Sequence, residues 1–152
     1  MATTDSTGAQ ELRRLLQGIF RKYGVLAADT TPCGKPLTMA HAHALMVLRT
    51  AGELSQRELA GELSIDKSNV ARLCARMVVA GHATQMTSAA DGRSRRVVLT
   101  ASGLRLAAEV EAASAARFGA LFEHLPAPRR KSILAALRDL EAVIGTLPTI
   151  PP

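Results

Sequence analysis

Two short helices joined by a tight turn are predicted within residues 54–81, and this pattern restricts the fold more than any other feature of the chain. Ser55 stands three residues before Glu58, which is the spacing of a capping box at a helix start. Residues 64–65 form the turn, and Asp66 caps the next helix. We therefore predict a helix-turn-helix unit, with buried positions at Leu59, Leu63, Ile65, Val70 and Leu73.

A charged hairpin is predicted directly after this unit. Its strands are expected at residues 83–88 and 95–99, with the tip at 89–94. The segment 97–99 is apolar and anchors the second strand, whereas the tip and the start of that strand are rich in arginine. Two short strands with a basic tip beside a recognition helix form a wing, and the combination indicates DNA binding.

Further helices are expected on both sides of the winged unit. Apolar side chains recur at three- and four-residue spacing before and after it, and prolines 126 and 128 interrupt the later stretch. The fold class is mainly α with a small β-wing, in a single domain. Its predicted parts are a disordered tail (1–8), a first helix (9–28), a DNA-binding lobe (38–100), a long linking helix (101–124) and a last helix (126–147).

The composition fits a partner that is a polyanion. The chain has 152 residues, a net charge of +6 and a pI near 10.1. No apolar run is long enough for a membrane span, and the N-terminal residues lack the apolar core of a secretion signal. Two cysteines make no disulfide framework, which is typical of a reducing compartment. Together with the preceding observation, this predicts a cytoplasmic protein without a membrane partner.

The exposed N-terminal side chains of the second helix are the candidates for reading DNA. Arg72 can bind guanine through two hydrogen bonds, and Asn69 can do the same with adenine. We expect Arg76, one turn further on, to reach a phosphate, and a solvated helix face is the alternative interpretation. The predicted contacts from this helix are Lys67, Ser68, Asn69, Arg72 and Arg76.

The wing residues are expected to divide the work. Arg93 at the tip can enter the minor groove, where the negative potential is enhanced. Arg95 and Arg96 can neutralise phosphates, which position the protein without reading sequence. Asp91 is expected to shape the tip by pairing with a wing arginine or with turn amides.

The charge of one lobe is modest. Residues 54–100 hold seven basic and four acidic side chains, a net charge of +3. Because phosphate contacts set DNA affinity and two copies would double them, this charge favours a dimer.

At this point the chain resembles the MarR family of transcriptional regulators. Asp91, Arg93, Leu99 and Thr100 match the family signature DxRxxxxxLT without gaps, and residues 59–81 resemble its helix-turn-helix. Two positions depart from the pattern. Ser64 stands where the turn often has glycine, and a serine is tolerated there if its φ is negative. His82 stands where leucine is usual.

The resemblance implies a homodimeric winged helix-turn-helix protein. It implies that helices 9–28 and 126–147 form the dimer interface, and that the partner is double-stranded DNA with a palindromic operator. It also implies repression that is relieved by a small-molecule effector or by oxidation. By position, Asn69 and Arg72 carry over as recognition-helix contacts and Arg93 as the minor-groove arginine.

The effector is the least constrained part of the prediction. In the family, the elements that carry the aromatic side chains border a pocket for phenolic ligands. Packing of the dimer core is the alternative explanation, and it is the commoner one for apolar side chains at helical spacing. The candidate pocket residues are Phe20, Tyr23, His41, Phe118 and Phe122.

Thiols and histidines are the residue types that control by oxidation or by metal binding would use. Cys33 lies in a Pro/Gly loop and is a candidate redox residue, so a regulator that responds to thiol oxidation is an alternative function. Cys74 is expected on the inward face of its helix. His41 and His43 are two residues apart and point to different helix faces, so no metal site is predicted, and no cofactor is expected.

Enzymes form a competing class that the sequence disfavours. No nucleophile stands with a base, and there is no Gly-rich phosphate loop. A winged-helix protein-interaction module is the other alternative, but it would need a neutral or apolar recognition face. The predicted function is therefore a DNA-binding transcription regulator that is not an enzyme.

Overall fold

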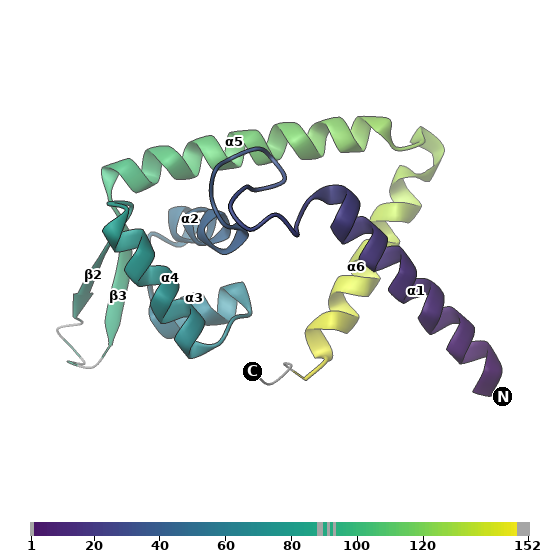
Figure 1. The fold of residues 1–152 in the computed structure, drawn as a ribbon, viewed down its shortest axis with the longest axis horizontal. Coiled ribbons are helices and arrows are strands. Elements are labelled where there is room, and N and C mark those ends of the chain that lie inside the picture. The colour runs from purple at the N-terminus through teal and green to yellow at the C-terminus, as the bar shows by residue number, and fades with distance from the viewer. Residues whose placement is uncertain (1, 88–89, 91, 93, 149–152) are drawn as a thin grey trace.

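A computed structural model of the chain describes residues 2–87, 90, 92 and 94–148. It is mainly helical with one small antiparallel sheet, as predicted (Figure 1). In chain order the elements are α1 (Ala2–Tyr23), α2 (Met39–Ala51), β1 (Glu53–Ser55), α3 (Gln56–Leu63), α4 (Lys67–Val79), β2 (Ala83–Thr87), β3 (Arg95–Leu99), α5 (Ala101–His124), the 3-10 turn η1 (Ala127–Arg129) and α6 (Arg130–Thr146).

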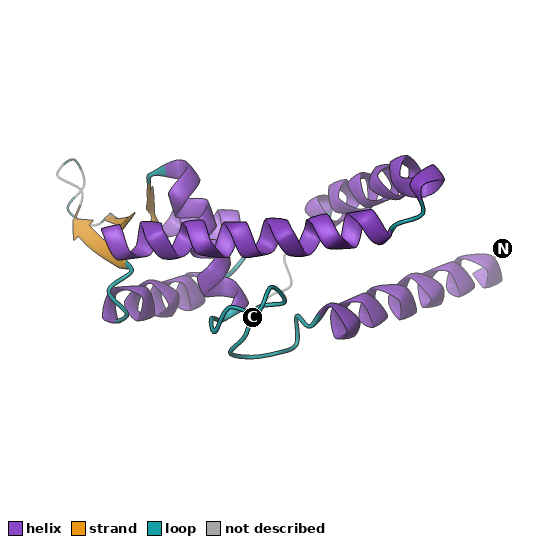
Figure 2. Cartoon of the chain, turned by 90° about the horizontal axis from the view of Figure 1, so that it is seen from above, coloured by secondary structure: helices purple, strands orange, loops and turns teal. Residues whose placement is uncertain are grey.

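The long helix α5 joins two parts of the molecule. Figure 1 shows it running across the top of the view, from the lobe that contains α2–α4 and the sheet to the region of α1 and α6. Seen from above, α1 and α6 lie on different sides of α5 (Figure 2). The helix thus holds the lobe at a distance from the two terminal helices.

The hydrophobic core lies within the lobe. Helix α2 packs on α5, and α3 packs on α4. Ion pairs on the surface add to this packing, since Arg49 of α2 pairs with Glu111 and Lys35 pairs with Glu109, both on α5. The largest fully buried side chains are Leu45, Leu48, Leu59, Val70, Cys74, Met77, Val97 and Val110.

The predicted helix caps of the lobe are present. The side chain of Ser55 accepts a hydrogen bond from the Glu58 backbone, and the Glu58 carboxylate accepts one from the Ser55 backbone, which completes the capping box. Asp66 caps α4 and Thr100 caps α5. Such bonds satisfy backbone donors that the helix leaves unpaired, typically stabilising it by about 1 kcal/mol.

The turn between α3 and α4 differs from the expectation. Ser64 has φ of 53° and lies in the left-handed region, whereas the sequence interpretation required a negative φ. Its backbone N–H bonds to the carbonyls of Ala60 and Gly61, so the C-cap geometry overrides the preference of a residue with a Cβ.

The sheet has one more strand than predicted. Its order is β1-β3-β2, with β3 in the centre and both neighbours antiparallel to it. The sequence does not predict the strand Glu53–Ser55, because three residues carry no readable alternation. β3 has the predicted bounds, and β2 ends at Thr87, one residue short of the expected end at Ser88, which lies outside the described residues.

The ends of the outer helices also differ from the prediction. α1 begins at Ala2, so residues 2–8 are helical rather than a disordered tail; the stretch has no proline, and Gly8 costs a helix only about 1 kcal/mol. The helix ends at Tyr23 rather than near residue 28, because Gly24 adopts φ of 89° and turns the chain. The last helix, expected from residue 126, begins at Arg130 after η1.

The outer helices expose a large apolar surface. α6, which lies wholly within the described part of the chain, has no buried residue. Among the described residues, no helix is long and apolar enough to cross a membrane. The exposed apolar side chains of α1, α5 and α6 are Leu12, Leu15, Ile19, Phe20, Leu104, Phe118, Leu121, Phe122, Leu134, Leu137, Val143 and Ile144.

Candidate nucleic-acid interface

Helix α4 has one buried and one polar face. Val70, Leu73, Cys74 and Met77 are buried against the lobe, which leaves the predicted contact residues outside. This separation follows from the 3.6-residue period of the helix. All five predicted contacts on this helix are exposed, namely Lys67, Ser68, Asn69, Arg72 and Arg76.

A network of hydrogen bonds runs along the start of α4. The Asp66 carboxylate accepts from the Ser68 hydroxyl and from the Asn69 backbone, both at 2.8 Å. The Asn69 side chain bonds to Asp66 on one side and to Arg72 on the other. These bonds, chiefly the one from the Asn69 backbone, lower the pKa of Asp66, so its carboxylate keeps its charge in mildly acidic solution.

A groove of about 770 Å³ separates α3 and α4 from the wing strands. Arg57, Lys67 and Arg95 line it and come from three different elements, and all three are exposed. The wall also contains Gln56 and Gln85, where the Gln56 amide donates to the Gln85 oxygen at 2.6 Å. Cations and amide groups around one groove are suited to a sugar-phosphate backbone.

Sequence reasoning missed part of this groove. Arg57, Gln56 and Gln85 were not assigned as contacts, although Arg57 entered the charge of the lobe. No spacing rule joins the two glutamines, which are 29 residues apart and meet only because β2 lies close to α3. Arg57 lies in the first turn of α3, and this position was the one signal in the sequence that could have identified it as a DNA contact.

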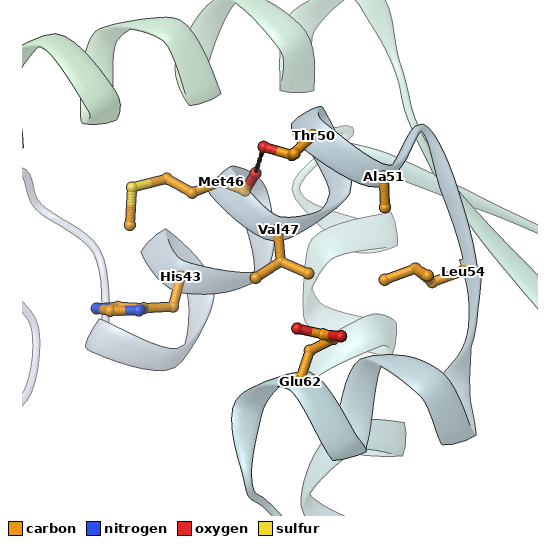
Figure 3. A pocket seen from close by; sticks show the side chains of 7 residues that line it. All are labelled: His43, Met46, Val47, Thr50, Ala51, Leu54 and Glu62. Carbon is orange, nitrogen blue, oxygen red and sulfur yellow. Dashed lines mark hydrogen bonds between the residues drawn. The ribbon is translucent and has the colours of Figure 1, made fainter. Parts of the chain in front are cut away.

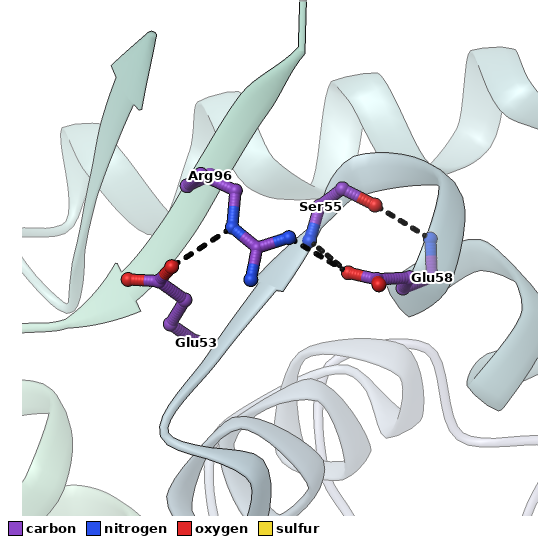
Figure 4. Close-up of polar contacts among 4 residues, drawn as sticks. All are labelled: Glu53, Ser55, Glu58 and Arg96. Carbon is purple, nitrogen blue, oxygen red and sulfur yellow. Dashed lines mark hydrogen bonds and ion pairs between the residues drawn. The ribbon is translucent and has the colours of Figure 1, made fainter. Parts of the chain in front are cut away.

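Arg96 makes contacts within the protein that the sequence did not predict. Its Nε bonds to Glu53 at 2.9 Å and its Nη1 to Glu58 at 3.1 Å (Figure 4). The backbone of Ser55 and then the guanidinium of Arg96 lower the pKa of Glu58, so this carboxylate stays charged. Arg96 thus ties β3 to β1 and to the start of α3, and these two carboxylates compete with a phosphate for its donors.

The other wing residues fall into two groups. Arg95 is exposed and lines the groove, as a phosphate contact would. Asp91 and Arg93, expected to shape the tip and to enter the minor groove, lie outside the described residues.

A separate cavity of about 100 Å³ lies where the end of α1, the following loop, α2 and α5 meet. The rings of Tyr23 and Phe118 are 5.5 Å apart in this region. Burial raises the pKa of Tyr23, and the nearby Arg117 opposes the shift, so the phenol stays protonated at neutral pH. The lining residues are Tyr23, Thr31, Pro32, Cys33, Met39, Ala42, His43, Met46, Val110, Ser114 and Phe118.

Two of the five predicted pocket residues line this cavity, Tyr23 and Phe118. Phe20 is about half exposed, and Arg130 covers the ring of Phe122 at 4.8 Å, so neither belongs to the lining. His41 is also absent from it, and His43 takes that place. The two histidines face different directions because they are two residues apart on a helix.

His41 instead bonds to the base of the wing. Its Nε2 lies 3.0 Å from Nδ1 of His82, and the rings meet edge to face. Burial, followed by the charge of His82, lowers the pKa of His41. The pair therefore links α2 to the junction between α4 and β2.

A shallow hollow between α2 and α3 borders the cavity (Figure 3). Its volume is about 430 Å³, and Glu62 of α3 faces Val47 of α2 across it. His43 and Met46 line both this hollow and the cavity.

The two cysteines differ in their surroundings. Cys33 is half-buried, and its Sγ lies 3.0 Å from the Thr31 hydroxyl. Cys74 is fully buried, and this burial raises the pKa of its thiol, which disfavours the reactive thiolate. Within the described residues, no cluster of three or more His, Cys, Asp or Glu side chains is placed to hold a metal ion.

Comparisons with known proteins agree with this geometry. The family model described as MarR family matches residues 35–94, which include α2–α4 and β2. No curated protein sequence matches the chain.

Solved structures with the same fold include regulators bound to DNA. FabT of Streptococcus pneumoniae, solved in complex with DNA, has a TM-score of 0.78 and 16% identity, covering 92% of this chain and 99% of its own. A mutant MarR from E. coli with operator DNA has a TM-score of 0.71 and 23% identity, covering 86% and 93%. BpsR of Bordetella bronchiseptica, whose DNA binding 6-hydroxynicotinic acid regulates, has a TM-score of 0.71 and 22% identity, covering 86% and 98%. At these identities the likeness establishes the fold.

Proposed function

Through residues 35–94 the chain belongs to the MarR family of DNA-binding transcription regulators, and we propose that it is a homodimeric repressor that a small ligand releases from a palindromic operator. The observation that carries the proposal is the groove beside α4, where Arg57, Lys67 and Arg95 gather next to the exposed polar face of the helix. A regulator of this kind acts in the cytoplasm, on the chromosome.

The division of contacts follows from this geometry. α4 enters the major groove with Arg72 toward a base edge, while Lys67, Arg76 and Ser68 contact the backbone. Arg57 and Arg95 bind phosphates from the two sides of the groove, and Arg93 at the wing tip enters the minor groove.

Gel shifts with DNA from beside the protein's own gene test DNA binding. We expect the affinity to fall by roughly 100-fold or more between 50 and 200 mM salt, because released counterions drive the binding. Absent binding, or binding that salt does not change, would contradict the repressor.

The dimer is proposed from the exposed apolar faces of the outer helices. α1, α6 and the distal half of α5 expose leucine, isoleucine and phenylalanine side chains that a lone protomer leaves in water. Contiguous apolar surface of this kind marks a protein interface. Pairing these faces in two copies would place two α4 helices on one palindromic operator.

The effector site is proposed at the cavity lined by Tyr23 and Phe118. Aromatic side chains of this kind pack favourably against an aromatic ring, and the Tyr23, Thr31 and Ser114 hydroxyls with His43 offer polar partners to a phenol or carboxylate. BpsR, which responds to a hydroxylated aromatic acid, has the same fold.

Titration with salicylate-like compounds tests the effector site. We expect them to raise the thermal midpoint of the free protein and to weaken its binding to the operator. His43→Ala should remove this response, whereas the matched variant His41→Ala should keep it, since His41 lies outside the cavity. An unchanged midpoint and operator affinity in the unmodified protein would count against a phenolic effector.

A thiol-based response is a second candidate, favoured by the position of Cys33 in the same cavity. If oxidation is the signal, peroxide should release the operator from the unmodified protein but not from Cys33→Ser. A protein-interaction module is less favoured, because α4 exposes Lys67, Asn69 and Arg72 rather than an apolar face.

A further inference from the structure

Three polar side chains at the start of α4 form a continuous relay. The Asp66 carboxylate accepts a hydrogen bond from Nδ2 of Asn69, and Oδ1 of Asn69 accepts one from Nη2 of Arg72 at 2.6 Å. The same carboxylate accepts from the Asn69 backbone at 2.8 Å, because Asp66 is the N-cap of the helix. Both ends of the Asn69 side-chain amide are therefore engaged within the protein.

The chemistry of the relay determines which way the amide points. The carboxylate only accepts hydrogen bonds and the guanidinium only donates them, so the amide must turn its NH₂ toward Asp66 and its oxygen toward Arg72. In the reverse orientation, the amide oxygen would face the carboxylate, which is also an acceptor, and the NH₂ would face the guanidinium, which is also a donor. Asp66 thus sets the orientation of Asn69, and Asn69 sets the position of Arg72.

An amide in this arrangement is poorly placed to read a base. Reading adenine requires the oxygen of the amide to accept from the base while its nitrogen donates. The oxygen of Asn69 already accepts a charge-assisted bond from Arg72, which is a strong type of hydrogen bond. Direct reading by Asn69 would have only the second lone pair of this oxygen and the second N–H of the amide, in an orientation that Asp66 and Arg72 have already set.

Arg72 keeps enough donors to read a base while it is held. A guanidinium carries five N–H donors, and the relay occupies only one of them in this structure. Asn69, Arg72 and Arg76 line the same shallow hollow beside the start of α2, so the relay lies along one face of α4. A side chain that is already ordered loses less conformational freedom on binding.

We propose that Asn69 is a positioning residue rather than a base reader, and that the Asp66–Asn69 pair orients Arg72 toward a single guanine in each half of the operator. This inference rests on the DNA binding proposed above. The sequence predicted two independent base contacts, at Asn69 and Arg72. The proposal instead has one base contact, Arg72, which Asn69 holds in position.

A double-mutant cycle on base preference tests the proposal. The full-length protein and the variants Asn69→Ala, Arg72→Ala and the double variant are each used to select binding sites from random duplexes. Arg72→Ala should reduce discrimination at one base position by about 10-fold to 100-fold. Asn69→Ala should reduce it several-fold at the same position, and should add nothing in the Arg72→Ala background.

Asp66→Ser separates the relay from the stability of the helix. Serine still caps α4, but it has no second oxygen for the Asn69 amide. This variant should keep the helix content of the unmodified protein in circular dichroism and should lose preference at the position that Arg72 reads. A merely structural role for Asp66 would leave that preference intact in the folded variant.

Two results would overturn the proposal. One is a loss of preference at a different base position in Asn69→Ala, and the other is an Asn69→Ala effect that persists when Arg72 is already alanine. Failure of the proposed function looks different, because the unmodified protein would then enrich no sequence at all.

Discussion

Arg95 and Arg96 are neighbours in the sequence, yet their side chains serve different purposes. Successive residues of a strand point to opposite faces of the sheet. Arg95 lines the groove beside α4, whereas Arg96 bonds to Glu53 and Glu58. A basic run in a wing can therefore include an arginine whose carboxylate partners lie within the protein.

Alanine substitutions at these two arginines should have distinct effects. Arg95→Ala should weaken DNA binding and make the slope of log affinity against log salt shallower by about 1.8, because each protomer of the proposed dimer neutralises one phosphate fewer. Arg96→Ala should keep this slope and lower the thermal midpoint by no more than about 4 °C, because ion pairs near the surface contribute little. Gel shifts across a salt series and thermal melts provide both measurements. A reduced slope in Arg96→Ala would show that this arginine does bind a phosphate.

At the scale of elements, the start of α5 lies unusually close to the base of the wing. A Cβ added to Gly103 would come within 1.9 Å of the His82 carbonyl oxygen. Thr100, the cap of α5, donates its backbone N–H to that same carbonyl. The absence of a side chain at Gly103 is what allows α5 to begin where the wing ends.

Two glycine substitutions in α5 should change stability in opposite directions. Gly103→Ala should lower the free energy of unfolding by about 1–3 kcal/mol, because the added methyl group meets backbone atoms that cannot move freely. Gly119→Ala, in the same helix with open space around it, should raise it by roughly 0.5–1 kcal/mol. Urea unfolding measures both values. Stabilisation by both alanines would contradict the close approach.

The His41–His82 pair should make the lobe sensitive to acid. In the folded protein the pKa of His41 lies below its ordinary value of 6.5, so the unfolded chain binds that proton more readily. The stability linked to neutral His41 is fully present above pH 6.5 and decreases as the pH falls from there toward the lowered pKa. Thermal midpoints measured from pH 7.5 to 5.5 should show this decrease, and His41→Gln should flatten it. An equal decrease in His41→Gln would assign the acid sensitivity to another group.

At the scale of the whole molecule, α1 and α6 leave apolar side chains exposed on one protomer. Leu137 is about half exposed in the middle of α6. A lobe with a net charge of +3 carries few cations for phosphates, so the proposed pairing of two copies would also raise the affinity for DNA.

Leu137→Glu should separate the proposed dimer. A charge placed within an apolar interface loses its hydration, so we expect monomers in sedimentation velocity and a loss of DNA affinity of roughly 100-fold or more. Arg138→Gln, on the same helix, is the matched control and should remain dimeric. A Leu137→Glu variant that stayed dimeric would move the interface away from this face.

Much of the lobe was predictable because its signals are local. The Ser55–Glu58 capping box, the Asp66 cap and the Thr100 cap each involve residues three positions apart, and the buried face of α4 follows from helical spacing. Interactions over such short separations are encoded in neighbouring residues. They therefore survive in the sequence as readable patterns.

Several of the departures depend on residues that are distant in the chain. The Arg96 carboxylate partners lie 38 and 43 residues away, Gln56 meets Gln85 across 29, and β1 exists only through its pairing with β3. His43 rather than His41 lines the cavity because the loop after α1 closes over one face of α2. Patterns among neighbouring residues were enough to predict a winged helix with basic side chains on the exposed face of α4. Tertiary packing decides which of these side chains have partners within the protein and which do not. The reason is that the partners of each charge come together only when the chain has folded.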